Sequence, residues 1–342
     1  MRRSSRKSSL SRPTILTVLA WSTSVLLLSG CAGAPASSAP SPSTSTSHSG
    51  YPIAVDNCGT QITFDAAPKR VVTIKSTSTE MLLALGLGNR IVGSAFSDGP
   101  AATAWAKQAK SLKILSDKIP AQEVVLEQRP DLVYAGWESN FSADGAGTRS
   151  TLHSLGVNSY VSPAACQEAA YKPAKLQFSN VFAEITEIGR IFNVPQAAAT
   201  LIASQKRQLA TVTPVEHKPS ALWWSSASST PYVGAGIGAP QMIMDAVGLT
   251  NIAANVKDTW SPLSWEAIIA ANPSVIVLVD ASWSTAQKKI GLLESNPATA
   301  GLYAVQHKRY LILPFAESEA GVRNVGAVLD LAGQLAALEK NP

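Results

Sequence analysis

The chain has 342 residues, which exceeds the size at which one hydrophobic core usually stops growing, so two domains are expected. With 46% hydrophobic and 15% charged residues, and no later apolar run near the roughly 20 residues of a bilayer span, the composition is that of a globular protein without a membrane helix after its N-terminal segment. Five of the basic residues behind the net charge of +5 lie among the first twelve residues, and the other 23 equal the 23 acidic ones in number, so a nucleic-acid-binding surface is not indicated.

Residues 1–31 have the pattern of an export signal. A basic start precedes an apolar stretch over 15–28, which is too short for a typical membrane-spanning helix. The sequence Leu28-Ser29-Gly30-Cys31 follows and resembles the bacterial lipobox, in which the cysteine is diacylated and becomes the mature N-terminus. The alternative is an ordinary secretory signal with an incidental cysteine. Because two acyl chains anchor a protein stably, we expect an extracytoplasmic protein that is lipid-anchored to the cell membrane through Cys31.

Residues 32–50 are rich in Ala, Ser, Pro and Thr and predict a disordered linker. Lipidation of Cys31 leaves Cys58 and Cys166, and in an oxidising compartment such a pair usually forms a disulfide, which we predict. Two separately buried thiols are the alternative. The chain has no C-x-x-C pair and its four histidines are scattered, so neither a metal site nor a cofactor is predicted.

The first lobe is expected over residues 51–175. Its opening predicts a strand over Val71–Ile74, a Ser/Thr-rich loop, and a helix that ends at Gly86 or Gly88. Thr77 to Thr79 are the expected helix caps, and Glu80 is the expected acid of the first turn.

One unit of the sequence occurs twice. Residues 122–136 (QEVVLEQRPDLVYAG) and 265–279 (WEAIIAANPSVIVLV) each predict a short helix, a proline loop and a buried strand. A glutamate, Glu123 or Glu266, stands seven residues before each proline. The spacing of 143 residues between the copies is too long for a solenoid repeat and indicates two similar lobes.

Residues 51 to about 340 resemble a known family. The pattern P-x-R-V-V, followed by T-E-x-L-x-A-L-G-L-x-x-R-I-V-G and PDLV with its preceding glutamate, is similar to the substrate-binding proteins of ABC importers for cobalamin, ferric siderophores and haem. The resemblance implies an α/β fold of two Rossmann-like lobes joined by a long rigid helix, with the ligand cleft between the lobes. It also implies a monomer that acts without catalysis and whose partners are a small-molecule ligand and a permease dimer with its ATPase subunits. In that family the two repeat glutamates, here Glu123 and Glu266, dock on the permease.

The connecting helix is expected over residues 176–212, with a kink or break after Asn193 because Pro195 removes a backbone donor. Two separate helices of one lobe are the alternative. The second lobe follows over residues 213–342. Its Gly234, Gly236 and Ala239 match a dinucleotide-binding fingerprint, but the acidic strand end that a Rossmann unit requires is missing, so the glycines are expected to bring backbone close to a ligand or to form a tight turn.

Tryptophans at predicted strand ends suit a ligand with planar faces, because the ends of strands in open α/β sheets form ligand crevices. Trp260 matches a cleft-lining tryptophan of cobalamin-binding relatives, and Arg323 lies near an arginine that contacts anionic ligands in siderophore relatives. One of Trp223 and Trp224 is expected to lie in the core, and Lys75 and Arg149 are further cation candidates. The predicted ligand-binding residues are Lys75, Trp137, Trp224, Gly236, Trp260, Trp283 and Arg323.

A large planar or chelate-type anionic ligand is therefore expected. Runs such as NCGT, YVSPAAC and PFAESEAGVRNV look closest to an actinobacterial branch that is proposed to bind a 5-deazaflavin coenzyme precursor, which is the first expectation for the ligand. A ferric siderophore or cobalamin is the alternative. An extracytoplasmic enzyme is disfavoured, since no G-x-S-x-G occurs and no histidine lies beside a strand-end serine.

The lipobox generates a first prediction. Cys31→Ser removes the acyl acceptor, so the protein should leave the membrane fraction or keep an uncleaved signal, as fractionation and intact mass would report. Unchanged mature mass together with unchanged membrane partition would contradict the lipoprotein interpretation.

Overall fold

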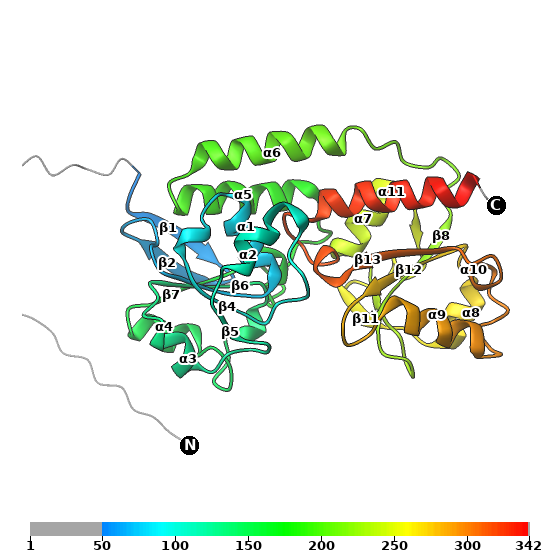
Figure 1. Ribbon diagram of the computed structural model, residues 1–342, viewed down its shortest axis with the longest axis horizontal. Coiled ribbons are helices and arrows are strands. Elements are labelled where there is room, and N and C mark those ends of the chain that lie inside the picture. The colour runs from blue at the N-terminus through cyan, green and yellow to red at the C-terminus, as the bar shows by residue number, and fades with distance from the viewer. Residues whose placement is uncertain (1–49, 341–342) are drawn as a thin grey trace, which may run out of the picture. The chain divides into compact units, whose positions relative to one another are not determined.

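The computed structural model describes residues 50–340 as two α/β lobes that follow one another along the chain (Figure 1). These residues belong to one compact unit. The export signal, Cys31 and the linker up to residue 49 lie outside the described part. Of the helices between residues 50 and 340, none has both the length and the apolar character needed to cross a bilayer.

The first lobe is built on a parallel sheet in the order β5-β4-β3-β6-β7. Its strands are β3 (Val71–Ile74), β4 (Ile91–Ala95), β5 (Ile114–Ser116), β6 (Leu132–Ala135) and β7 (Asn158–Val161). A separate antiparallel hairpin of β1 (Ile53–Asn57) and β2 (Thr60–Phe64) precedes it. The helices are α1 (Ser76–Ala84), α2 (Ala106–Lys110), α3 (Gln122–Glu127) and α4 (Arg149–Ser154). Strands β3 and β6 are buried along their whole length, as expected for a parallel sheet covered on both faces.

The second lobe has a mixed sheet in the order β11-β9-β8-β12-β13, with β10 beside β8. Its parallel centre consists of β8 (Ser220–Ser226), β12 (Val275–Asp280) and β13 (Tyr310–Pro314), with β10 (Thr250–Asn251) also parallel. The edge strands β9 (Tyr232–Gly234) and β11 (Trp260–Pro262) are antiparallel. The helices are α7 (Ala239–Val247), α8 (Trp265–Ala271), α9 (Ala286–Ser295), α10 (Tyr303–Gln306) and α11 (Asn324–Lys340).

The expected helix over 176–212 is divided into α5 (Phe178–Ile191) and α6 (Pro195–Leu209), with the break where Pro195 predicted it. Asn193 adopts a left-handed conformation (φ 56°), and the chain then reverses so that α6 packs beside α5 (Figure 1). Helix α6 also packs against α11 of the second lobe. The connection is therefore a helical hairpin whose second helix reaches both lobes, and a single continuous helix is wrong.

The repeated unit has the predicted form in both copies. Helix α3 leads to β6 and helix α8 leads to β12, and Glu123 and Glu266 lie in the first turns of the two helices. Helix α8 is capped by Ser264, whose hydroxyl accepts from the Ala267 amide. Each copy thus delivers a buried strand next to the centre of its sheet.

The start of α1 differs from the prediction. The helix begins at Ser76, and no side chain caps it. The hydroxyls of Ser78 and Thr79 instead donate back to main-chain carbonyls at the end of β3. Glu80 is buried and forms an ion pair with Arg323, so it does not act as a first-turn acid.

A disulfide joins Cys58 and Cys166 in the structure, across 108 residues of sequence and a Cα–Cα distance of 5.3 Å. It links the β1–β2 turn to the loop after β7, and both sulfurs pack on buried Val161. The start of the first lobe is thereby attached to the loop that closes it.

A buried carboxyl group lies between α5 and the first sheet. Glu184 on α5 is 4% exposed, and its Oε1 accepts a hydrogen bond of 2.7 Å from the Tyr134 hydroxyl. Burial raises the pKa of Glu184 from 4.5 to about 7, although the hydrogen bond from Tyr134 acts in the opposite direction. The folded state therefore holds this proton more tightly than the unfolded state does.

A second prediction concerns stability against pH. The stabilisation from protonated Glu184 is complete below about pH 4.5 and is lost as the pH rises through about 7. Glu184→Gln keeps an acceptor for Tyr134 without this titration. Between pH 5 and pH 8, wild type should therefore lose roughly 2–4 kcal/mol of unfolding free energy that the variant does not lose. Urea denaturation at both pH values measures the change, with Glu127→Gln at an exposed position as the control. If variant and wild type differ in free energy of unfolding by the same amount at pH 5 and pH 8, the raised pKa of Glu184 is refuted.

Candidate functional site

A cavity of about 680 Å³ lies where the carboxyl ends of strands from both lobes meet. In the first lobe, β3 and β6 are neighbours although β4 and β5 separate them in sequence, and this reversal of strand order is where open α/β sheets bind ligands. Lys75 directly follows β3, and Gly136 and Trp137 directly follow β6. In the second lobe, Ser226 ends β8 and Phe315 follows β13, and both line the cavity.

The second lobe contributes a row of aromatic rings. Tyr232 and Trp260 stack at a centroid distance of 6.4 Å, and Trp260 and Phe315 stack at 6.3 Å with 16° between the ring planes. Trp283 meets Phe315 edge-on at 5.3 Å and is 55% exposed. Such a wall offers flat apolar surface to a ligand.

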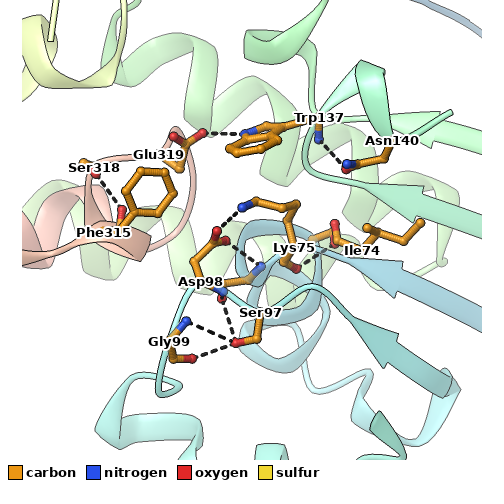
Figure 2. A network of polar contacts seen from close by, with 12 residues as sticks. Ile74, Lys75, Ser97, Asp98, Gly99, Trp137, Asn140, Phe315, Ser318 and Glu319 are labelled. Atoms are coloured by element: carbon orange, nitrogen blue, oxygen red, sulfur yellow. Dashed lines mark hydrogen bonds and ion pairs between the residues drawn. The ribbon is translucent and has the colours of Figure 1, made fainter. Parts of the chain in front are cut away.

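The first lobe contributes two further rings, Phe96 and Trp137, and a buried cation, Lys75; Figure 2 shows Lys75 beside Trp137. Phe96 and Trp137 meet edge-on at 5.8 Å. The Lys75 ammonium lies 3.7 Å from the centre of the Trp137 ring and 4.3 Å from that of Phe96, so cation–π attraction adds to its ion pair with Asp98. Both members of that pair are almost completely buried.

The backbone at Lys75 is strained in order to point this side chain into the cavity. Its φ of 83° and ψ of 155° fall in a region that glycine adopts and that costs other residues about 1–3 kcal/mol. Gly136 leaves the room that Lys75 needs, because a Cβ there would lie 2.8 Å from the Lys75 Cβ and 2.3 Å from Thr77 Oγ1. Strain of this kind is common at ligand sites.

Glu319 is an acidic residue in the same cavity. One carboxylate oxygen accepts a 2.8 Å hydrogen bond from Trp137 Nε1, as Figure 2 shows. The other oxygen is buried and has no donor among residues 50–340. Burial, helped by the nearby charge of Asp98, raises the pKa of Glu319 to about 7, while the charge of Lys75 and the indoles of Trp137 and Trp260 act against that rise.

Four of the predicted ligand residues, Lys75, Trp137, Trp260 and Trp283, line this cavity, and three others do not. Arg323 is one of the three. Its guanidinium is buried, pairs with Glu80 of α1 and donates to the Pro100 carbonyl at 2.7 Å. The residue is therefore a contact between the lobes, and its expected place in the cavity is wrong.

Trp224 and Gly236 also lie outside the cavity lining, so their predicted role in ligand binding is wrong. Trp224 is 1% exposed in the core of the second lobe, and its indole donates to the Ser226 and Ala227 carbonyls. Trp223, on the other face of β8, is equally buried, so both tryptophans are core residues. A Cβ at Gly236 would lie 2.0 Å from the Ala254 carbonyl oxygen, so this glycine permits contact with a neighbouring loop and has no contact with the cavity.

The structure adds residues that were not predicted to bind a ligand. Phe96 follows the carboxyl end of β4, and Phe315 and Glu319 follow that of β13, and all three line the cavity, so the strand-end rule applied to every strand would have found them. Asp98, also after β4, does not line the cavity but pairs with Lys75. Arg149, in contrast, donates to Asn57 and Ser159 within the first lobe and has a structural role. In the described range, no group of three or more His, Cys, Asp or Glu side chains is arranged to hold a metal ion.

The two repeat glutamates lie away from the cavity lining. Glu123 and Glu266 are both exposed. Hydrogen bonds from its own backbone and from Ser264 lower the pKa of the Glu266 carboxyl, as at the start of many helices.

Comparison with known proteins identifies the family. A substrate-binding lipoprotein of an ABC transporter from Bacillus subtilis strain 168, itself uncharacterised, is 27% identical over 292 residues, covering 82% of this chain and 85% of that protein. The vitamin B12-binding protein of Photorhabdus laumondii is 26% identical over 244 residues, covering 67% of this chain and 76% of the relative. The solved structure of the ABC-type Fe³⁺-hydroxamate transport system from Saccharomonospora viridis has the same fold, with a TM-score of 0.72 at 23% identity over 83% of this chain and 99% of that one. Residues 71–317, from β3 to the loop after β13, match the periplasmic binding protein family, and the chain belongs to that family.

Proposed function

We propose that this chain is the extracytoplasmic substrate-binding component of an ABC importer, which captures a large ligand with flat apolar faces and delivers it to the permease. The observation that carries the proposal is the cavity at the carboxyl ends of both sheets, with stacked aromatic rings on one side and a preformed Lys75 and Trp137 floor on the other. Its size suits a small-molecule site. The relatives named above support the role in transport, and catalysis is not part of the proposal.

The ligand class that we propose is a cobalamin, ferric siderophore or haem. The B12-binding relative supports the first of these. The 5-deazaflavin precursor expected from sequence has less support, because none of the three predicted cation candidates is free for its acidic group: Lys75 pairs with Asp98, Arg323 pairs with Glu80, and Arg149 donates to Asn57 and Ser159. An acidic ligand would have to compete with these buried partners.

The remaining assignments are part of the same proposal. The chain would be tethered through Cys31 and would work as a monomer with a permease dimer and its ATPase subunits. Glu123 and Glu266 would contact that permease, because each is an exposed carboxylate at the start of the helix that opens its copy of the repeat. The identical placement in both lobes fits a partner made of two similar halves.

The ligand proposal predicts the effect of removing one ring. Trp260→Ala breaks the stacked row at its middle and should weaken binding by roughly 1–3 kcal/mol, as loss of an aromatic anchor does. Calorimetric titration with cyanocobalamin, haemin, ferrioxamine B and a 5-deazaflavin measures this, and mass spectrometry of ligand that co-purifies with the protein extends the panel. Tyr303→Ala, at an exposed aromatic position outside the cavity lining, is the control. Equal affinity of wild type and Trp260→Ala for a ligand that binds would exclude the aromatic wall as the site.

The docking proposal predicts a separation of binding from transport. Glu123→Ala combined with Glu266→Ala should leave ligand affinity and melting temperature nearly unchanged, because both side chains are exposed and lie outside the cavity lining. Ligand-stimulated ATP hydrolysis and uptake by the reconstituted transporter should be lost. Glu127→Ala combined with Glu216→Ala removes two other exposed carboxylates as a control. Normal transport by the Glu123 and Glu266 double variant would reduce both residues to favourable charges at helix starts, worth about 0.3–1 kcal/mol each.

A further inference from the structure

Acidic side chains outnumber basic ones in the lining of the cavity. Carboxylates of Glu138, Asp258 and Glu319 line it, together with the ammonium groups of Lys75 and Lys172. The charge of Lys75 is taken up by Asp98, with which it forms a buried pair. Lys172 is exposed, where solvent screens its charge. Asp258 is exposed and screened in the same way, so the balance rests on Glu138 and Glu319, and the lining still offers more negative than positive charge to a bound molecule.

One of the three carboxylates, that of Glu319, has a fixed position and one buried oxygen. Glu138 is partly exposed and accepts from the Gln167 amide, and Asp258 is exposed and accepts from the Thr259 amide. Glu319 is held by the Trp137 indole, and the Trp260 indole lies close enough to lower the pKa of the carboxyl, but the second oxygen makes no hydrogen bond within residues 50–340. A buried carboxylate oxygen without a donor is unfavourable, so a ligand that supplies a donor beside it gains that interaction.

We infer that Glu319 makes the cavity selective for ligands whose enclosed part is positively charged or rich in hydrogen-bond donors, and that it disfavours carboxylate-bearing or otherwise anionic ones. The inference rests on the proposed function, because it specifies the charge of the ligand that the aromatic walls enclose. Those walls attract cations as well, since the faces of Trp137, Trp260 and Phe315 carry negative potential. Lys75 illustrates this, because its ammonium already lies against two of the cavity's rings.

Matched ligand pairs test the inference independently of shape. The three pairs are ferrioxamine B and its N-acetyl derivative, haemin dimethyl ester and haemin, and cyanocobalamin and one of its monocarboxylic acids. Within each pair the first member is the more positive and the skeleton is the same. Affinities are measured at pH 8, where Glu319 is ionised because its pKa is about 7. Wild type should bind the more positive member of a recognised pair about tenfold more tightly, as expected for charges that interact at the edge of the protein interior.

Glu319→Gln should reduce that preference to less than about threefold, mainly by weakening binding of the more positive member. Glutamine keeps the shape of the side chain and an oxygen for the Trp137 indole, so a merely structural role of Glu319 would leave the preference in place. Glu216→Gln, which removes an exposed carboxylate outside the lining, should keep the full preference.

The outcomes distinguish failure of the charge selectivity from failure of the proposed function. If a pair binds and its more negative member binds equally or more tightly, the charge selectivity is overturned while the proposed function stands. If Glu319→Gln retains the full preference, the assignment to Glu319 is overturned. If none of the six compounds binds, the proposed ligand class is wrong and the selectivity inferred from it falls as well.

Discussion

The buried ion pair between Lys75 and Asp98 is the interaction on which the ligand site depends. An ammonium group enclosed by protein stays charged only when a partner and suitable dipoles replace its water. Asp98 supplies the opposite charge, and the faces of Phe96 and Trp137 complete the surroundings. The left-handed backbone at Lys75 and the missing side chain at Gly136 are both needed to bring the ammonium to this point. The floor of the cavity is thus held by contacts within the first lobe itself.

A second buried pair has a different role, because it joins the lobes. Arg323 from the start of α11 reaches Glu80 on α1, and Gln205 on α6 donates to the Val322 carbonyl at 2.8 Å. The bond from Trp137 to Glu319 also crosses between the lobes, directly at the cavity. The guanidinium charge of Arg323, predicted from the sequence to bind a ligand, is neutralised by Glu80 in the contact between the two lobes. That use of Arg323 leaves the aromatic rings and Glu319 as the groups of the cavity lining on which the proposed ligand selectivity rests.

Much of this architecture could be predicted from the sequence, since strands, helices and their order follow from local patterns of apolar residues, glycine and proline. The duplicated unit predicted β6 and β12, predicted strand ends indicated Trp137 and Trp283, the family resemblance indicated Trp260, and Lys75 was predicted as a cation candidate. Pairing could not be predicted in the same way. Asp98 lies 23 residues from Lys75, and Glu80 lies 243 residues from Arg323, so no local pattern shows that either cation is neutralised. The placement of Trp224 failed because a run of alternating residues does not show that both faces of a strand are covered.

The disulfide changes the connectivity of the first lobe as well as its packing. The bond between Cys58 and Cys166 links two residues that are 108 positions apart. The main chain between them, which holds the whole parallel sheet, is therefore closed into a covalent ring. A protease that cuts one peptide bond inside this ring opens it but releases no fragment, so both ends of the cut stay attached. Cys166 itself lines the cavity, and the loop that carries it would therefore stay joined to the β1–β2 hairpin after such a cut. In the oxidising space outside the cytoplasm, a nicked copy of the protein would still carry every residue of its binding site in one covalent molecule.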